Sequence, residues 1–231
     1  MKICGIQKTS LVDYPGHLAT VIFTGGCNFN CPYCHNSQLI SPDVEAEYTV
    51  GYTLLMLEQR KHLIDAVVIS GGEPTLQPDL HAFISKVKAM GFKVKLDTNG
   101  SNPDVLKKLI EDGLLDYVAM DVKDRRSAYD AYCSSSEHFD IINKIDESIL
   151  TLLFNDVPYE FRTTLVKGLH VLADAGYIGR MIKGAKNYYI QNFRAVDSVT
   201  TDNYRPFTED ELEKFADAVR PYVKNVYIRG V

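Results

Sequence analysis

The chain has 231 residues, of which 45% are hydrophobic and 24% charged, and its formal net charge is −5. These values are typical of a globular protein with a sizeable core. The sequence lacks the clustered cations that nucleic-acid binding needs and any apolar stretch near the roughly 18 residues of a membrane span. Five cysteines, three of them crowded together, indicate metal binding in a reducing compartment. We therefore expect a soluble cytoplasmic protein that binds neither nucleic acid nor membrane.

The order of the predicted elements indicates an α/β fold. Runs rich in β-branched and aromatic residues alternate with helix-like segments. The predicted strands are 18–24, 66–70, 92–98, 116–122, 159–166, 186–193 and 225–229, and the predicted helices are 49–61, 78–90, 103–111, 137–154, 169–175 and 209–219. Such alternation implies right-handed βαβ units and a parallel sheet, as a full or partial barrel or an open doubly wound sheet. No linker divides the chain, so we expect a single domain over 1–231.

Two helix starts carry clear signals. Thr208 precedes Glu211 by three residues, which is the spacing of a capping box. Asn102 precedes Pro103, and proline is favoured at the first helical position because its missing N–H costs little there. These signals predict helices that begin at 209 and at 103.

Polar motifs follow four consecutive predicted strands. A cysteine-containing loop follows the first, Gly71-Gly72-Glu73-Pro74 the second and Asn99-Gly100 the third, and Asp121-Val122-Lys123 closes the fourth. Active sites of parallel α/β folds lie at the carboxyl ends of the strands. The sequence therefore predicts that these motifs form one site.

The cysteine loop, residues 25–36, is the most specific motif. Cys27, Cys31 and Cys34 have C-x3-C-x2-C spacing, and no fourth cysteine lies nearby. Iron–sulfur clusters normally take four thiolates, so three would leave one iron of a [4Fe–4S] cluster open to a ligand that is not protein. Structural zinc needs a fourth ligand, and His35 is awkwardly placed because it adjoins Cys34. A non-catalytic iron–sulfur or zinc protein is the alternative from another class.

The two remaining cysteines lie far apart in the sequence. Cys4 and Cys133 cannot supply the four ligands of an auxiliary cluster. We expect both to be free structural thiols.

The run from Cys27 to Cys34, with Tyr33 before the last cysteine, resembles the signature of the radical S-adenosylmethionine (SAM) superfamily. The segments 13–16 (Asp-Tyr-Pro-Gly), 26–27 (Gly-Cys) and 33–36 (Tyr-Cys-His-Asn) resemble the small activating enzymes of glycyl radical enzymes. Residues 7–16 are most similar to activators of anaerobic ribonucleoside-triphosphate reductase. The resemblance implies a partial (β/α)6 TIM-like barrel that holds a [4Fe–4S] cluster and SAM.

The same resemblance implies the chemistry. SAM would chelate the open iron, and one electron from the cluster would cleave it to methionine and a 5′-deoxyadenosyl radical. Cofactors carry such radical chemistry, while the protein binds, orients and excludes solvent. Hydrogen abstraction by a carbon radical needs no general base, so no catalytic residue is expected beyond the cluster and the cofactor.

Several residues are expected to contact SAM. In the motif Gly71-Gly72-Glu73-Pro74 the glycines let the backbone approach a ligand closely. The resemblance adds that this backbone and Glu73 bind the methionyl amino group. Asp97 and Asn99 suit ribose or cation contacts, although their segment could equally be a turn. The resemblance places Tyr33 and His35 at the cofactor, with His35 next to the adenine.

Charged side chains on two later strands complete the prediction. Asp121 and Lys123 alternate around Val122 and so share one face of a strand. The resemblance places them beside the cofactor and an incoming glycine loop, and the alternative is a salt-bridged strand end. Arg162 either points inward to a carboxylate of the cofactor or of Asp121, or lies on the surface. Gln191 is a weaker candidate for adenine or ribose contact.

The resemblance implies a protein substrate. The expected activity is hydrogen abstraction from a glycine of a glycyl radical enzyme, namely anaerobic ribonucleotide reductase, with flavodoxin or ferredoxin as electron donor. The alternatives are activation of pyruvate formate-lyase or another glycyl radical enzyme, or a radical reaction on a small molecule.

Overall fold

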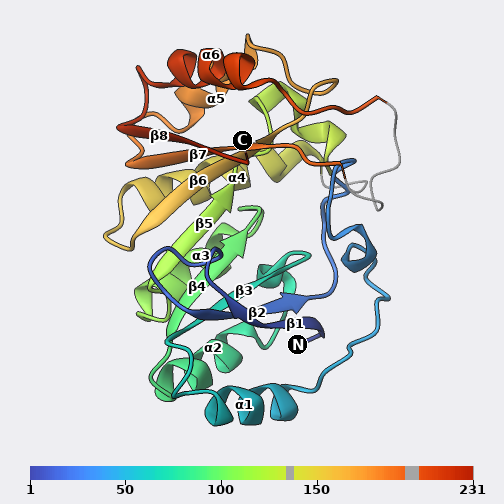
Figure 1. Ribbon diagram of the computed structural model, residues 1–231, viewed down its shortest axis with the longest axis vertical. Helices are drawn as coiled ribbons and strands as arrows, with labels where there is room; N and C mark the ends of the chain where they lie inside the picture. The colour runs from blue at the N-terminus through green and yellow to red at the C-terminus, as the bar shows by residue number, and fades with distance from the viewer. Residues whose placement is uncertain (134–137, 196–202, 231) are drawn as a thin grey trace. The chain divides into compact units, whose positions relative to one another are not determined.

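The computed structural model describes residues 1–133, 138–195 and 203–230 (Figure 1). The chain forms two compact units. The first unit contains residues 1–28, 38–98 and 102–118, and the second contains 29–37, 99–101 and 119–231. The strand β5 (Tyr117–Asp121) begins in the first unit and ends in the second.

The sheet of the first unit contains one antiparallel and two parallel pairings. Strand β1 is antiparallel to β2, whereas β2, β3 and β4 are parallel neighbours. Their bounds are Ile3–Ser10 for β1, Ala19–Thr24 for β2, Ala66–Gly71 for β3 and Lys93–Thr98 for β4. The sequence did not predict β1, because Gly5, Gln7 and Lys8 have low strand propensity and disturb the alternation of apolar residues.

The first unit has three α-helices in its described residues, which begin within two residues of their predicted starts. They are α1 (Val50–Gln59), α2 (Leu80–Ala89) and α3 (Pro103–Glu111), with the short 3-10 turn η2 (Pro74–Leu76). Pro103 is the first residue of α3, as predicted. The core of this unit includes Val67, Val68 and Ile69 of β3, which are fully buried. Such a continuous apolar run is typical of a strand covered on both faces.

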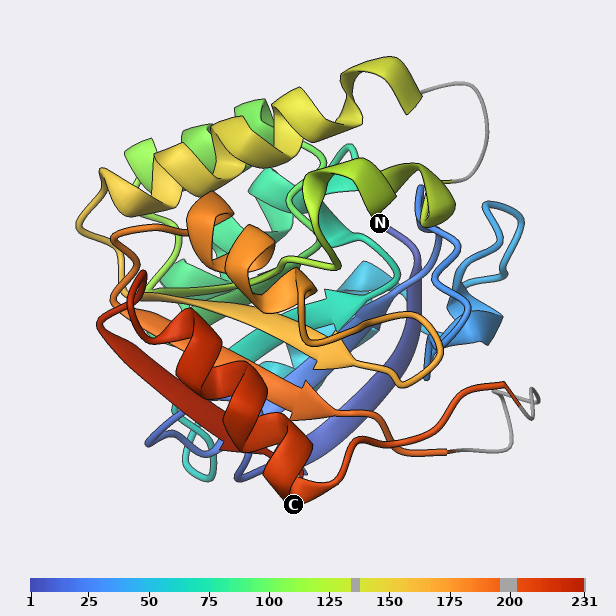
Figure 2. The same ribbon diagram turned by 90° about the horizontal axis from the view of Figure 1, so that it is seen from above.

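The described part of the second unit holds three further strands and three α-helices. Strands β6, β7 and β8 are parallel neighbours, and Val122, just after β5, donates its N–H to the Arg162 carbonyl (2.8 Å). The bounds are Tyr159–Leu165 for β6, Asn187–Asn192 for β7, Asn225–Arg229 for β8, His138–Leu153 for α4, Asp174–Met181 for α5 and Glu209–Val219 for α6. Figure 2 shows α5 and α6 beside each other. The capping box at Thr208 and Glu211 is confirmed. Residue 137, the predicted start of α4, lies outside the described residues.

The predicted helix at 169–175 was wrong. The chain turns at this point instead, because His170 accepts the Val166 N–H through Nδ1 (3.0 Å) and Asp174 accepts the Val171 N–H (2.8 Å). Side chains that bond to the nearby backbone in this way compete with helix formation. Helix α5 therefore begins at Asp174.

The strand order confirms the predicted fold class. Among the described residues, the strand order in the sheet is the order along the chain, from β1 to β8. Of the strand pairings described above, β1–β2 is antiparallel and the others are parallel, which is consistent with the predicted partial barrel. That the whole chain is one domain stays a prediction.

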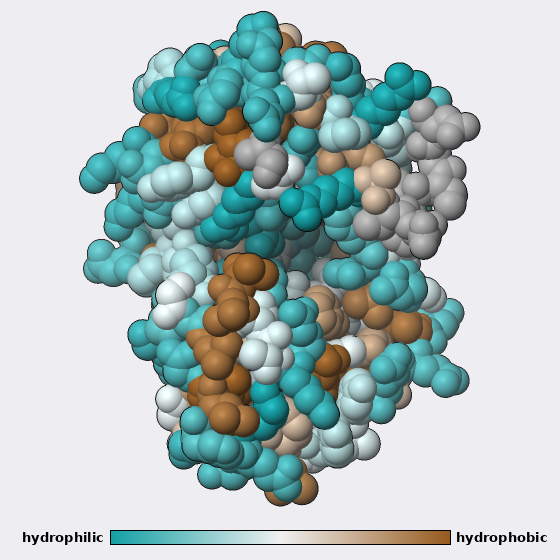
Figure 3. All heavy atoms as spheres, viewed as in Figure 1, coloured by the Kyte–Doolittle hydropathy of each residue, from teal (hydrophilic) through white to brown (hydrophobic). Residues whose placement is uncertain are grey.

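The surface is mostly hydrophilic in the view of Figure 3, where hydrophobic side chains form separate patches. Among the helices that the structure describes, none has the length and apolar character needed to cross a membrane.

Candidate cofactor site

The cysteine loop starts directly after β2. The Gly26 N–H donates to the Leu39 carbonyl (2.8 Å), and the Cys27 N–H donates to the Ile40 carbonyl (3.0 Å). Two backbone hydrogen bonds thus hold the first cysteine of the loop in the first unit. The short 3-10 turn η1 (Ser37–Leu39) ends at Leu39.

The glycines at the end of β3 pack against the residues before Cys27. Gly71 has φ +119°, and a Cβ on it would lie 2.3 Å from the Thr24 nitrogen. A Cβ on Gly72 would lie 2.2 Å from the Gly26 carbonyl oxygen. The Glu73 N–H donates to that same oxygen (2.8 Å). Only glycine fits such close backbone contacts, which explains the two adjacent glycines at this strand end.

The Glu73 side chain is fully buried and joins the ends of β3 and β4. Its Oε1 accepts the Thr75 N–H (3.1 Å), the Thr75 hydroxyl (2.6 Å) and the Thr98 hydroxyl (2.7 Å). It thereby caps η2, which Pro74 begins. Contact of Glu73 with the SAM amino group stays a prediction, and the observed contacts fix where this carboxylate lies.

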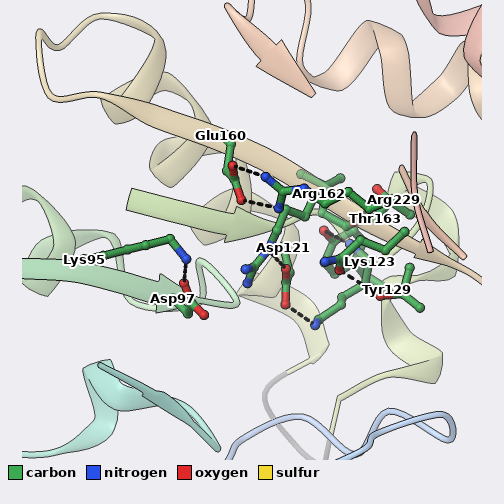
Figure 4. Close-up of polar contacts among 12 residues, drawn as sticks. Lys95, Asp97, Asp121, Lys123, Tyr129, Glu160, Arg162, Thr163 and Arg229 are labelled. Atoms are coloured by element: carbon green, nitrogen blue, oxygen red, sulfur yellow. Dashed lines mark hydrogen bonds and ion pairs between the residues drawn. The ribbon is translucent and has the colours of Figure 1, made fainter. Parts of the chain in front are cut away.

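Asp97 forms a buried ion pair that the sequence reasoning missed. The Lys95 Nζ lies 2.5 Å from Asp97 Oδ1, and the two side chains are 2% and 14% exposed (Figure 4). Alternation along β4 places both residues on one face, and this signal could have revealed the pair. The predicted ribose or cation contact of Asp97 remains untested.

In the second unit, Asp121 lies between two cations (Figure 4). Its Oδ1 is 2.8 Å from Arg162 Nε, and its Oδ2 is 2.8 Å from Lys123 Nζ. Arg162 therefore points to Asp121, one of the partners predicted for it. Burial alone would raise the pKa of Asp121, but the charges of Arg162 and Lys123 outweigh burial and hold it well below its ordinary value.

Tyr129 and Thr163 brace this charged group. The Tyr129 hydroxyl accepts the Lys123 N–H (3.0 Å), and the Thr163 hydroxyl donates to the Val122 carbonyl (2.6 Å). The sequence singled out neither residue, because no motif marks Tyr129 and the contact of Thr163 joins positions 41 residues apart in the chain.

The other two cysteines lie in the second unit. The Cys34 N–H donates to the Cys31 carbonyl (3.0 Å), which closes a turn. Tyr33 is buried between the rings of Tyr132 (6.1 Å) and His170 (6.4 Å). The Tyr33 hydroxyl oxygen is buried and has no hydrogen-bond partner among the described residues.

Three of the residues predicted to contact SAM make polar contacts within the second unit. His35 Nε2 lies 3.1 Å from the Arg194 carbonyl oxygen. Asn99 Oδ1 accepts the Ser101 N–H (2.9 Å), so this segment does form a turn. Gln191 Oε1 accepts the Thr164 hydroxyl (3.4 Å). Cofactor contacts by these residues stay predictions.

The donor chemistry of the loop fits an iron–sulfur cluster. Thiolates are the usual cluster ligands, and the loop carries three cysteines within eight residues. Burial raises the pKa of the Cys31 and Cys34 thiols, and the Lys123 ammonium opposes this effect. Within the part of the chain that the structure describes, no three His, Cys, Asp or Glu side chains are gathered as a ready metal site. The assignment of Cys27, Cys31 and Cys34 as cluster ligands thus rests on the sequence and on donor chemistry.

The two isolated cysteines make backbone contacts. The Cys4 thiol donates to the Glu45 carbonyl and the Cys133 thiol to the Tyr129 carbonyl, each at 3.4 Å. Neither cysteine forms a disulfide in the described residues, in line with the prediction.

Comparison with known proteins decides the family. The model of the radical SAM superfamily matches residues 21–149. A Methanocaldococcus jannaschii protein, provisionally named as a glycyl-radical enzyme activating enzyme, is 37% identical over 99% of this chain and 96% of its own length. The chain belongs to the radical SAM superfamily. Within the superfamily it groups with the glycyl-radical enzyme activating enzymes, and its cofactors are those of the family, a [4Fe–4S] cluster and SAM.

One further relative and one solved structure are also similar to this chain. The pyruvate formate-lyase-activating enzyme of Clostridium pasteurianum is 33% identical over 53% of this chain and 52% of its own length. The crystal structure of Streptococcus suis SuiB bound to the precursor peptide SuiA matches 91% of this chain with a TM-score of 0.66 and 14% identity. This chain spans about half (48%) of the SuiB chain, and the likeness concerns the fold alone.

Proposed function

We propose that this radical SAM enzyme abstracts a hydrogen atom from a backbone glycine of anaerobic ribonucleoside-triphosphate reductase. The observation that carries the proposal is the end-to-end match to a protein named as a glycyl-radical enzyme activating enzyme. The similarity of residues 7–16 to activators of the anaerobic reductase supports this choice of partner. We further propose that the enzyme acts in the cytoplasm, binds neither nucleic acid nor membrane, and takes its electron from flavodoxin or ferredoxin.

Cys27, Cys31 and Cys34 would hold the cluster, and Gly71-Gly72-Glu73-Pro74 would hold the SAM amino group. When bound, the reduced cluster and SAM supply a carbon-centred radical that can take a hydrogen atom from glycine. The protein's own task is to position the cofactor and the substrate and to exclude solvent from them. Asp121 remains ionised and fixes the directions of Lys123 and Arg162, so these side chains are pre-organised for a charged ligand.

The loop between β1 and β2 supports a protein as substrate. Leu11 and Val12 at its tip are 78% and 82% exposed. The tip is not loose, because the Ser10 hydroxyl contacts the Asp13 carboxylate and accepts the N–H groups of Val12 and Asp13 (3.2 Å each). A rigid loop that presents two adjacent apolar side chains suits docking to another protein better than binding a small molecule.

A pyruvate formate-lyase activase is the second candidate. The similarity to the Clostridium enzyme favours it, although that match covers only half of either chain. The two candidates differ in the protein that receives the radical.

The test begins with anaerobic reconstitution and reduction in the presence of SAM. We expect 5′-deoxyadenosine to form in the wild type and not in a Cys31→Ala control, and its absence from both would refute radical SAM chemistry. The enzyme is then mixed with the anaerobic reductase or with pyruvate formate-lyase, and the glycyl radical doublet is sought by electron paramagnetic resonance. A doublet on pyruvate formate-lyase alone would overturn the choice of partner.

A further inference from the structure

A groove of about 400 Å³ in the second unit is lined by several arginines. Its walls come from the start of the 3-10 helix η3 (Arg126–Ala131) and from α5, two elements that pack together (Figure 2). The lining residues are Arg125, Arg126, Ser127, Tyr177, Arg180 and Met181. Three of these six carry a guanidinium, and none of the described lining residues carries a carboxylate. The groove is therefore suited to an anionic ligand.

Two of the arginines are held in fixed directions. Arg125 contacts the buried Asp174 (2.5 Å) and donates from Nε to the Ser127 hydroxyl (3.2 Å). Arg126 pairs with Asp146. Each guanidinium has five N–H donors, so these contacts leave donors for a further acceptor.

Arg180 carries the uncompensated charge of the groove. Its guanidinium lies 4.7 Å from the centroid of the exposed Tyr177 ring, and it donates to the Tyr222 hydroxyl (3.4 Å). It has no carboxylate partner among the described residues. A guanidinium that rests on an aromatic ring is positioned in advance to bind a carboxylate.

The segment that forms one wall of the groove also contacts the cysteine loop within the same unit. At its far end, the Tyr132 carbonyl accepts the Asn30 N–H (2.7 Å), and the Tyr132 ring packs against Tyr33. The Tyr129 ring packs against Phe29 (6.3 Å). A protein bound at the groove would thus be separated from the cysteine loop by one short segment.

We propose that this arginine groove docks a small acidic electron-carrier protein. The inference rests on the proposed function, in which a cluster at this loop must receive an electron. The carrier loses one electron and the cluster gains one, and no bond or proton changes. The chain as a whole is negatively charged (−5), so an acidic carrier is attracted only at a local cationic patch, which also orients it.

The groove fits a carrier better than the glycine substrate. A radical target must reach the cofactor itself, whereas an electron can cross intervening protein. Carboxylates are the groups that a set of guanidiniums recognises best on a protein surface. An acidic protein face therefore satisfies both the charge of the groove and its position next to the cysteine loop.

Charge reversal in the groove tests the proposal by binding. An acidic flavodoxin is titrated into the wild type, Arg180→Glu, Arg126→Glu and the control Lys107→Glu by calorimetry at low salt. Lys107 is exposed on α3 and gives the same change in net charge. We expect Kd to rise about tenfold or more in each groove variant and to change less than twofold in the control. The difference should vanish near 1 M salt, where the Debye length is about 3 Å.

An activity measurement separates docking from catalysis. With flavodoxin hydroquinone as reductant, both groove variants should form 5′-deoxyadenosine more slowly by a similar factor, whereas with dithionite they should match the wild type. Unchanged flavodoxin binding in both variants, with native circular dichroism, would overturn the proposal. An equal loss in Lys107→Glu would overturn it too. If the wild type forms no 5′-deoxyadenosine with either reductant, the proposed function fails, and the calorimetry still decides docking.

Discussion

Replacing Gly72 by alanine should damage the start of the cysteine loop. An alanine Cβ would lie 2.2 Å from the Gly26 carbonyl oxygen and 2.7 Å from its carbonyl carbon, whereas real Cβ contacts essentially never fall below 3.0 Å. Both obstacles are backbone atoms, so no side chain can swing away. The two backbones must separate by about 0.8 Å, from 2.2 to 3.0 Å.

The expected cost follows from two contributions. Inserting a methyl group into a filled space typically costs about 1–3 kcal/mol. Separating the backbones also weakens the hydrogen bond from the Glu73 N–H to the Gly26 carbonyl, which adds about 1 kcal/mol. We therefore expect Gly72→Ala to lower the free energy of unfolding by about 2–4 kcal/mol.

The assay is urea unfolding of the cluster-free protein under anaerobic conditions, with iron content measured after reconstitution. Gly51→Ala is the matched control, because nothing lies within 4 Å of a Cβ at that position in α1. The control should raise the free energy of unfolding by about 0.5–1 kcal/mol, the usual gain from alanine within a helix. Gly72→Ala should also bind less iron than the wild type, because the displaced backbone leads directly into Cys27.

The reasoning would be refuted if Gly72→Ala unfolded like the wild type and bound as much iron. That result would mean that the contact between residues 26 and 72 relaxes at no cost. A loss of stability with full iron binding would refute only the link from this contact to the cysteine loop.

Two further predictions concern polar groups at the candidate site. Thr98→Val should lower the free energy of unfolding by about 1.5–3 kcal/mol, because it removes a hydroxyl bonded to the buried Glu73 carboxylate. The control Thr20→Val should lower it by only about 0.5–1.5 kcal/mol, because the Thr20 hydroxyl donates to a neutral carbonyl. Equal losses of the two variants in urea unfolding would contradict this prediction. Asp121→Asn should lower the free energy of unfolding by a constant amount from pH 8 to about pH 5, and by a progressively smaller amount below about pH 4. The sign follows from a folded pKa below the ordinary 3.8: the ionised carboxylate stabilises the fold above that value, and as the pH falls further the unfolded chain takes up the proton first. Urea unfolding of both proteins across this pH range checks the prediction. A difference in the free energy of unfolding between wild type and variant that grows as the pH falls would count against it.

Much of the fold was predictable from local patterns. The strand–helix alternation identified β2 to β8, and the capping signals placed the starts of α3 and α6. The edge strand β1 was missed because its pairing with β2 compensates for weak local propensity. The helix predicted at 169–175 failed because the contacts of His170 and Asp174 with the backbone are visible only once the chain is folded.

The candidate site divides in the same way. The cysteine loop and the motif after β3 were recognisable because residue type and spacing carry the information. The fit of Gly72 against Gly26 and the bond between Thr98 and Glu73 join segments far apart in the sequence, and no local pattern encodes them. The Lys95–Asp97 pair lies between these cases, since strand alternation would have placed both side chains on one face.

The division of β5 between the two compact units has a consequence for protein engineering. Residues 117 and 118 belong to the first unit, and 119 to 121 belong to the second. A chain cut at this boundary would leave each fragment with a truncated strand whose N–H and C=O groups lack part of their ladder, and such ends promote aggregation. The boundary is therefore a poor place to split this enzyme for complementation from two expressed halves.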